Sequence, residues 1–474
     1  MKVSIAGTGY VGLTSGVCFA ELGHDVCCYD IDKRKIDMLS HGSIPIYEPG
    51  LKELLEKNKK RLKFTTDAKE AVNFGDIIFI GVGTPSREDG SVNLDYIDSV
   101  AESIGKYIDS YKVIVNKSTV PVGTKERVTN IIKKHYKGSF DVISSPEFLR
   151  EGCAVTDTLE PDRIVLGTNS EKAKEMMFNL YKKIPQSKIF VTDSKSSELI
   201  KYASNTFLAF CISYVNNLTK EYPDYDVNEL TYHFREKLNP RGFFGVGVGF
   251  GGSCFPKDVK ELISFTDTIK IDSKILKEIM EINETQKLFF FNKIKNLREG
   301  STIGVLGLAF KPDTDDMRDA PSISIVKKLL DIGFNVKAHD PISEEEAKKI
   351  LDIEYCSNPY EVAEDADALI LVTEWNHFRN LNLSKIKELM KNPLIYDGRN
   401  VFDRKKTNGF EYHDIGRGHK KFNEHEKEEQ IKRFLNKCDL FAKKITEICK
   451  KVGANPDNVL EGMKLDSRIG RNMF

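Results

Sequence analysis

A glycine-rich turn near the start of the chain restricts the possible fold more than any other feature. The apolar run Lys2–Ala6 predicts a short buried strand, and Gly7, Gly9 and Gly12 follow it in the spacing GxGxxG. A helix is predicted directly afterwards, over residues 14–22. Glycines at this spacing let a pyrophosphate approach the backbone at the start of a helix.

The next strand ends on a carboxylate. Asp25–Tyr29 predicts the second strand, and Asp30 follows it. Strand, glycines, helix, strand and terminal acid together form the dinucleotide-binding fingerprint of a doubly wound α/β fold. The alternative is an ordinary βαβ unit with a glycine turn. We expect NAD rather than NADP, because a carboxylate at residue 30 would repel a 2′-phosphate.

Two more predicted strands, over residues 76–82 and 112–116, continue the parallel-sheet pattern. Ligands of open α/β sheets bind at the carboxyl ends of the strands. Each loop could also be a plain turn, since glycine and proline mark turns in general. The loops that we expect at this edge contain Thr84, Pro85, Thr119, Glu147 and Glu151.

The rest of the chain predicts further domains. Residues 196–296 have a helical pattern, and a second strand–helix series without GxGxxG begins at Thr302. We predict an α/β protein with two Rossmann-like parallel-sheet domains, joined by a central helical segment and followed by an extra helical C-terminal tail. The predicted boundaries are 1–195, 196–296, 297–417 and 418–474.

Cations lie at the predicted strand ends of the second α/β domain. Lys311, Arg318 and Arg399 occupy these loops, where they suit a phosphorylated ligand held between the two domains. Solvated charges are the alternative for each of them taken alone.

A second glycine-rich stretch carries a cysteine. Residues 249–258 read GFGGSCFPKD, so Cys254 lies on a loop whose glycines let a ligand approach. The thiol can be a nucleophile or a small buried hydrophobe, and the loop alone does not decide. Lys201 and Asn205 share one face of a predicted helix, although Lys201 could equally be a solvated surface lysine.

Composition excludes several classes of protein. The formal net charge is zero with a pI near 7.1, which gives no reason to expect nucleic acid or an anionic membrane as a partner. Nine cysteines without CxxC spacing favour reduced thiols over disulfides or a zinc site. The chain has neither an apolar run long enough to span a membrane nor the pattern of a signal peptide. We expect a soluble cytoplasmic protein without a metal.

Nine motifs in order carry a resemblance to a known family: GTGYVG, IYEPGL, GTP, KSTVPVGT, SPEFLREG, PDRIVLG, GFGGSCFPKD, FKPDTDDMRDAPS and DGRN. Over about residues 1–417 the chain resembles the UDP-glucose/GDP-mannose dehydrogenase family. IYEPGL and SPEFLREG are similar to its UDP-glucose branch.

The resemblance implies a two-fold oxidation of UDP-glucose to UDP-glucuronate that uses two NAD and one water. Cys254 would form a thiohemiacetal and then a thioester, so that the aldehyde does not escape. A homodimer is also implied. Two alternatives stay open: a related dehydrogenase of a UDP-N-acetyl sugar or GDP-mannose, or a catalytically inactive NAD-binding regulatory protein.

The resemblance also implies site residues. Lys201 and Asn205 would stabilise an alkoxide, either Lys201 or Lys257 would lower the pKa of the thiol, and Glu147 would be a base tuned towards neutral pH. The implied catalytic residues are Cys254, Lys201, Asn205, Asp258, Glu147 and Thr119. The implied cofactor residues are Gly7, Gly9, Tyr10, Val11, Gly12, Asp30, Lys35, Thr84, Pro85, Thr119, Glu151, Lys257 and Arg318. The implied substrate residues are Phe148, Leu149, Arg150, Glu151, Lys201, Asn205, Phe250, Gly251, Lys311 and Arg399, with Arg241 and Arg468 as competing additions.

Arg241 and Arg468 compete because the chain departs from the family pattern. In the family, a segment resembling LDxRIGxxF carries an arginine to the sugar site of the neighbouring subunit. Residues 226–245 match that segment poorly, and Arg241 is the nearest candidate there. Residues 441–474 are a second and better copy that contains LDSRIG with Arg468, and Asn455 and Pro456 predict a helix cap. Either the tail docks where the family places this segment, on its own or a partner subunit, or it is a duplicate without a role.

Overall fold

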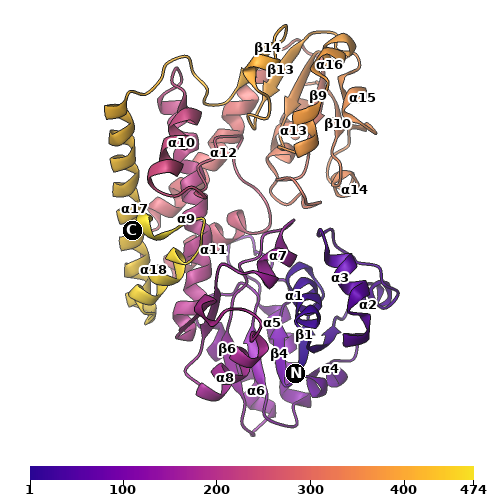
Figure 1. Ribbon diagram of the computed structural model, residues 1–474, viewed down its shortest axis with the longest axis vertical. Coiled ribbons are helices and arrows are strands. Elements are labelled where there is room, and N and C mark those ends of the chain that lie inside the picture. The colour runs from indigo at the N-terminus through magenta and orange to yellow at the C-terminus, as the bar shows by residue number, and fades with distance from the viewer.

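The N-terminal part of the chain forms an eight-stranded sheet with helices on both faces. The computed structural model describes residues 1–474 (Figure 1). The strand order is β3-β2-β1-β4-β5-β6-β7-β8, and all neighbours are parallel except β6 and β7. The strands are β1 Lys2–Ala6, β2 Asp25–Tyr29, β3 Leu62–Thr65, β4 Ile77–Ile80, β5 Val113–Asn116, β6 Asp141–Ser144, β7 Ile164–Gly167 and β8 Ile189–Thr192. The helices are α1 Tyr10–Glu21, α2 Lys33–Ser40, α3 Leu51–Lys57, α4 Ala68–Phe74, α5 Asp95–Tyr107, α6 Thr124–His135, α7 Ala154–Leu159 and α8 Glu171–Leu180.

A second sheet lies at the opposite end of the molecule (Figure 1, top right). Its six strands are all parallel in the order β11-β10-β9-β12-β13-β14, the order of a doubly wound fold. The strands are β9 Thr302–Leu306, β10 Asn335–His339, β11 Glu354–Tyr355, β12 Ala368–Leu371, β13 Leu394–Asp397 and β14 Glu411–Asp414. The helices are α13 Pro321–Asp331, α14 Glu344–Ala347, α15 Pro359–Ala363 and α16 Leu383–Leu389.

Long helices connect the two sheets. The central helices are α9 Ser194–Glu221, α10 Val227–Lys237, α11 Phe255–Thr268 and α12 Lys274–Ile294. The tail forms α17 Glu424–Val452 and α18 Pro456–Lys464, and Figure 1 shows α17 beside α9 along the left edge. One continuous hydrophobic core joins α9, α10, α17, α18 and the second sheet. None of the helices combines the length and the low polarity that crossing a bilayer requires.

The predicted fold class is confirmed, and β1 and β2 have the predicted bounds. The first helix begins earlier than expected, at Tyr10, because Gly9 of the glycine turn is itself the N-cap. The other predicted strands end up to two residues sooner, where the chain leaves the sheet for the loops that carry the candidate site residues.

Candidate active site

The glycine turn before α1 has the shape that a pyrophosphate needs. Gly7 has φ +100°, and a Cβ on Gly12 would lie 2.0 Å from the carbonyl oxygen of Gly7. No atom lies within 4 Å of the place where a Cβ on Gly9 would be, and no side chain caps the helix there. The first-turn amides of Tyr10 and Val11 therefore have no side-chain cap. This combination fits a dinucleotide phosphate.

The carboxylate at the end of β2 is held beside this turn. One oxygen of Asp30 accepts from the backbone N–H and the hydroxyl of Thr8, both at 2.7 Å, and the other accepts from Asp32 N–H at 3.0 Å. Asp30 is only half-buried, so its oxygens stay accessible to ribose hydroxyls. Lys35 lies half-buried on α2 near this carboxylate in the sequence.

The loops after β4 and β5 meet at the same sheet edge. The Thr84 hydroxyl donates to the Thr119 carbonyl oxygen at 3.1 Å, and Pro85 beside it is exposed. These residues lie as expected for the carboxyl edge of a parallel sheet.

Cys254 occupies the N-cap position of α11, where its side chain makes no capping hydrogen bond, and it is half-buried. Its sulfur lies 3.6 Å from the Ser253 hydroxyl. Burial raises the pKa of this thiol to about 11, and Lys201 only partly opposes that effect. As expected, Lys201 lowers the pKa of the thiol, but burial outweighs this effect in the free protein. Lys201 and Lys257 are each paired with a carboxylate.

Two buried polar pairs surround the thiol. Lys201 Nζ lies 2.9 Å from Glu147 Oε1, and Asn205 Nδ2 donates to Asp258 Oδ2 at 2.6 Å. Lys257 Nζ approaches the other oxygen of Asp258 at 2.7 Å. The structure thus brings together the implied catalytic side chains from α9, α11 and the loop after β6.

The carboxylate of Glu147 is not tuned towards neutral pH, contrary to expectation. Burial alone would raise its pKa, but Lys201 and the backbone N–H of Leu149 lower the pKa below its ordinary value. Leu149 N–H donates to Glu147 at 2.6 Å. Glu147 is an ionised acceptor at neutral pH.

Glu151 is the carboxylate with a near-neutral pKa. Burial and the nearby charge of Asp316 raise its pKa to about 7, although Arg318 and Lys311 oppose them. Its oxygens accept from the Ser253 hydroxyl at 2.8 Å and from Arg318 at 3.4 Å. The Glu151 carbonyl also accepts from Lys311 Nζ. Glu151 therefore joins the cysteine loop to the second α/β domain.

The glycine loop packs directly against that domain. A Cβ on Gly251 would lie 2.4 Å from the Asp319 carbonyl oxygen, so only glycine fits there. Phe250 is fixed through its backbone, which donates to and accepts from the Asn283 side chain at 2.8 and 3.0 Å. Gln286 donates to the Gly247 carbonyl at 2.9 Å. The sequence analysis missed Asn283 and Gln286, because no motif or pattern in the sequence of α12 distinguishes the face on which they lie.

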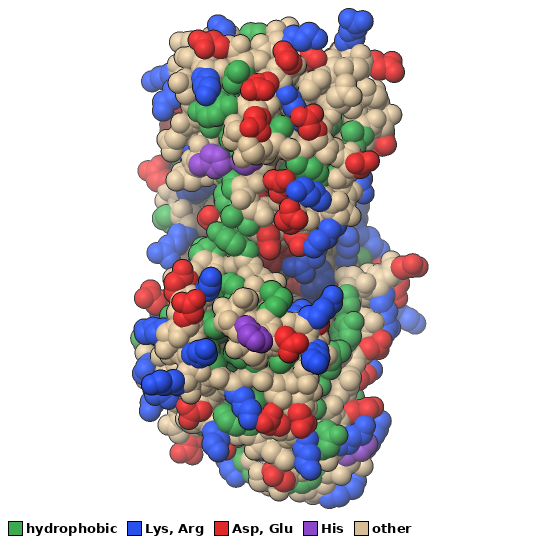
Figure 2. Space-filling view, turned by 90° about the vertical axis from the view of Figure 1, so that its right-hand side faces the viewer, with side chains coloured by type: hydrophobic (Ala, Val, Ile, Leu, Met, Phe, Trp, Pro, Cys, Tyr) green, Lys and Arg blue, Asp and Glu red, His purple; other side chains and the backbone are tan.

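Arg399 lies beside the same loop. Its Nε donates to the Val372 carbonyl at 2.8 Å and is 3.3 Å from Glu374, and a Cβ on Gly247 would lie 3.2 Å from its guanidinium. Figure 2 shows the molecule hollowed between its upper and lower lobes, with charged side chains of both signs around the recess.

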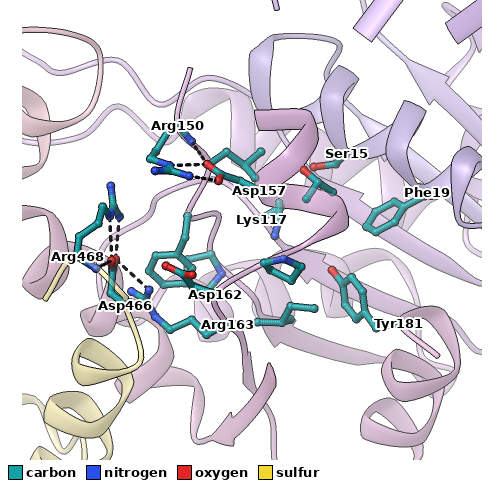
Figure 3. A pocket seen from close by; sticks show the side chains of 16 residues that line it. Ser15, Phe19, Lys117, Arg150, Asp157, Asp162, Arg163, Tyr181, Asp466 and Arg468 are labelled. Atoms are coloured by element: carbon teal, nitrogen blue, oxygen red, sulfur yellow. Dashed lines mark hydrogen bonds and ion pairs between the residues drawn. The ribbon is translucent and has the colours of Figure 1, made fainter. Parts of the chain in front are cut away.

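A pocket lies beside the loop of Phe148, Leu149 and Arg150 (Figure 3). Arg150 is bound by Asp157, with Nε 2.9 Å from a carboxylate oxygen. The tail contributes Asp466 and Arg468 to this pocket, whereas Arg241 is exposed and does not line it. Cys254 is not among the lining residues either.

Glu48, within IYEPGL, is a further residue that sequence reasoning did not single out. It is buried and accepts from the backbone N–H groups of Gly152 and Ala154, both at 2.7 Å, and from the Tyr10 hydroxyl. It ties the glycine turn to the loop that carries Glu151. The motif IYEPGL was the feature of the sequence that could have indicated Glu48, because it contains a carboxylate without an evident local partner.

Comparison with known proteins covers most of the chain. Residues 1–185, 195–285 and 304–404 match the NAD binding, central and UDP binding domains of the UDP-glucose/GDP-mannose dehydrogenase family. A UDP-glucose 6-dehydrogenase of Bacillus subtilis is 44% identical over 88% of this chain and 93% of its own length. One of Rhizobium meliloti is 42% identical over 88% of this chain and all of its own length. The tail lies beyond all three family domains.

Solved structures show the same arrangement. A UDP-glucose dehydrogenase of the archaeon Pyrobaculum islandicum has a TM-score of 0.82 at 35% identity, covering 88% of this chain and 98% of that one. A UDP-D-ManNAc dehydrogenase of Pyrococcus horikoshii has a TM-score of 0.77 at 27% identity, covering 88% of this chain and all of that one.

Proposed function

Since the chain belongs to the UDP-glucose/GDP-mannose dehydrogenase family, we propose that it oxidises UDP-glucose twice, to UDP-glucuronate, with NAD as the oxidant. It is an NAD-dependent dehydrogenase with a UDP binding domain at residues 304–404. The observation that carries the proposal is the placement of Cys254 among the Lys201–Glu147 and Asn205–Asp258 pairs.

The glycine turn and Asp30 would hold NAD, and two NAD molecules in succession would take up the two hydrides. In the first oxidation the sugar C6 loses a hydride, and its hydroxyl loses a proton to solvent water. Lys201 has three N–H donors and Asn205 has two on its amide nitrogen, of which one binds Asp258. Their remaining donors stabilise the developing alkoxide and then the aldehyde oxygen.

The aldehyde is captured on the chain itself. The Cys254 sulfur forms a bond to the aldehyde carbon, and the thiol proton passes to the oxygen, which gives a thiohemiacetal. Loss of a second hydride from that carbon, and of the hydroxyl proton, leaves a thioester on Cys254. Capture prevents release of the aldehyde between the two oxidations.

Water completes the reaction. It attacks the thioester carbon, the carbon–sulfur bond breaks, and the acid leaves as the sulfur regains a proton. Glu147 and Asp258 are acceptors near the thiol that orient this water, with Thr119 beside them at the sheet edge. Because the pKa of Glu147 is low, it holds the water by hydrogen bonding and takes its proton only briefly.

The predicted substrate residues fit a nucleotide sugar between the domains. We assign the backbone of Phe148 to Glu151 and the loop of Phe250 and Gly251 to the sugar, with Lys311 and Arg399 as the cations of the second domain that hold the same ligand. Lys257 and Arg318 are assigned to the cofactor side.

The stoichiometry of reduction tests this proposal. The chain should release two NADH for each UDP-glucose consumed, whereas one indicates a simple alcohol dehydrogenase and none an inactive NAD-binding protein.

Cys254→Ser should abolish glucuronate formation, and Cys153→Ser, a change at the exposed cysteine, should leave it unaltered. Unchanged glucuronate formation by Cys254→Ser would refute the thioester route. A panel with GDP-mannose and a UDP-N-acetyl sugar decides between related substrates.

We also propose a cytoplasmic location, supported by nine unpaired cysteines, of which seven are buried. The homodimer and the domain boundaries 1–195, 196–296, 297–417 and 418–474 stay predictions.

A further inference from the structure

The tail repeats the structure of the segment that follows the first half of α9. In the first copy Asp226 caps α10 and accepts from Glu229 N–H, and in the second Asn455 caps α18 and accepts from Asn458 N–H. Counted from these caps, Arg468 takes the place of Asn239 and Asp466 that of Lys237. The first copy therefore lacks both the carboxylate and the guanidinium that the second provides.

The second copy is docked on its own chain. Six buried residues of α17 are spaced alternately three and four positions apart, which is the spacing of the core positions of a coiled coil. They are Ile431, Phe434, Cys438, Phe441, Ile445 and Ile448. Phe441 packs edge-on against Phe207 of α9 at 5.4 Å between ring centres, and Phe434 stacks on Phe210 at 5.7 Å. The tail thus covers an apolar face of α9.

The tail also neutralises a cation of the N-terminal domain. The Arg163 side chain is 1% exposed, and Asp466, at 3.0 Å, is the only carboxylate within ion-pair distance of it. An unpaired charge at such a site is strongly destabilising. The guanidinium of Arg163 lies 3.9 Å from the centre of the Phe148 ring. Asp466 therefore contacts the side of the pocket that carries Phe148 through Arg163.

Arg468 lines the same pocket (Figure 3). Asp466 binds its guanidinium through two hydrogen bonds, at 2.9 and 2.8 Å, which fixes its direction. The Ser467 carbonyl accepts from the Asn239 side chain at 2.9 Å, and the Ser467 hydroxyl donates to Asp162. The loops of the two copies thus meet, and it is the second that reaches the pocket.

We propose that residues 418–474 act as a covalently attached stand-in for a second subunit, completing the substrate pocket in cis. Arg468 contacts the nucleotide sugar, and Asp466 is a positioning residue that holds both Arg468 and Arg163. This inference rests on the proposed function for the identity of the substrate. One chain then contains a complete site, and a dimer, where one forms, contributes no residue to it.

Substitutions in the full chain test the role of Arg468. Arg468→Ala should raise the KM for UDP-glucose about tenfold or more with a smaller change in kcat, and Arg468→Lys should restore part of the loss. Arg471→Ala, at an exposed arginine three residues later, is the matched control and should change neither constant. An unaltered KM in Arg468→Ala, or a larger loss in Arg241→Ala, would overturn the proposal. A melting curve for each variant separates misfolding from lost binding.

A complementation experiment decides between cis and trans. Cys254→Ala and Arg468→Ala chains, carrying different tags, are produced in the same cells. If Arg468 acts in cis, every active site in the mixture lacks either Cys254 or Arg468. The mixture should then have no more activity than the two variants measured separately. Recovered activity means that Arg468 serves another copy and overturns the proposal.

Dilution of the unmodified protein gives an independent readout. Turnover per chain should stay constant from micromolar to subnanomolar concentration, and a fall that substrate prevents would contradict a cis site. If the unmodified chain instead fails to oxidise UDP-glucose, the proposed function fails. In that case hydrogen exchange in α18 of Asp466→Asn still tests the docking, and unchanged exchange would overturn it.

Discussion

At the scale of single residues, burial opposes the ionisation of two groups at the site. The thiol of Cys254 is less acidic than a free cysteine, and Glu151 retains a proton well above the usual range of a carboxylic acid. Lys201 and Glu147 avoid this cost by pairing with one another. Activation of the thiol must therefore accompany binding of the substrate and the cofactor, which change the charges around it.

Alkylation should show that the thiol is neutral in the free protein. With a pKa of about 11, modification of Cys254 by iodoacetamide should rise roughly tenfold per pH unit from about pH 7 to 10 without a plateau. Lys201→Ala should slow it, because Lys201 lowers the thiol pKa. The rate is followed by mass spectrometry in a Cys153→Ser background. A plateau below about pH 9 would contradict the prediction.

Glu151 should make the folded protein less stable as pH rises. Its pKa is raised from 4.5 to about 7, so the folded state binds the proton more tightly than the unfolded state. Stability is then lost between these two pH values, by about 3 kcal/mol relative to Glu151→Gln. The comparison uses urea unfolding followed by Trp375, the only tryptophan. Exposed Glu53→Gln is the control, and a pH-independent difference for Glu151→Gln would refute the prediction.

At the scale of elements, two loops are fitted to each other without space for a side chain. Gly251→Ala would force a Cβ to 2.4 Å from the Asp319 carbonyl, whereas nothing lies within 4 Å of a Cβ on Gly245 in the same stretch. Displacing the cysteine loop by about 1 Å should reduce kcat/KM about 100-fold. Gly245→Ala should leave it within about twofold. Equal effects of the two changes would show that the fit between the loops does not matter.

The elements themselves were largely predictable from local pattern. Strands such as β1 and β2 are short, mostly apolar runs next to turns, so their bounds follow from the sequence. The glycine turn and Asp30 also indicate their chemistry locally, whereas the role of Cys254 was indicated only by the family resemblance. Asn283 could not be found in this way, since it binds the distant backbone of Phe250. Glu48 stands in a visible motif, but its backbone partners lie more than a hundred residues away in the sequence. The raised thiol pKa was missed because it depends on burial and on which carboxylate each lysine meets.

At the scale of the whole molecule, the sequence showed that the tail is a second copy but not where it docks. The LDSRIG repeat and the cap at Asn455 were visible as patterns, whereas the seam on α17 was not singled out. That the tail meets Arg163 of its own chain depends on the packing of helices more than two hundred residues apart in the sequence, for which no local signal exists. The family resemblance implied only a neighbouring subunit at this place.

A double-mutant cycle measures how strongly the tail and the N-terminal domain depend on each other. Asp466→Leu leaves Arg163 buried without an anion, and this should cost about 3–5 kcal/mol, seen as faster hydrogen exchange throughout α18. Arg163→Met with Asp466→Leu removes both charges of this pair and should recover the part of the loss that comes from Arg163, while Arg468 lacks its carboxylate in both variants. In the unmodified chain the protection should weaken in acid, because Arg468 and Arg163 together keep the pKa of Asp466 well below its usual range.

The ion pair of Arg433 with Glu221 is the matched control, since it also joins the tail to α9 but lies at the surface. Its cycle should give less than about 1 kcal/mol, because water screens exposed charges and two long side chains lose freedom when they pair. Comparison of the two cycles separates the effect of a buried charge pair from the effect of holding the tail in place. If the two cycles give the same coupling, Asp466 is an ordinary surface contact and the tail is held by α17 alone. If only the buried pair couples strongly, removing the tail withdraws an anion that the N-terminal domain requires.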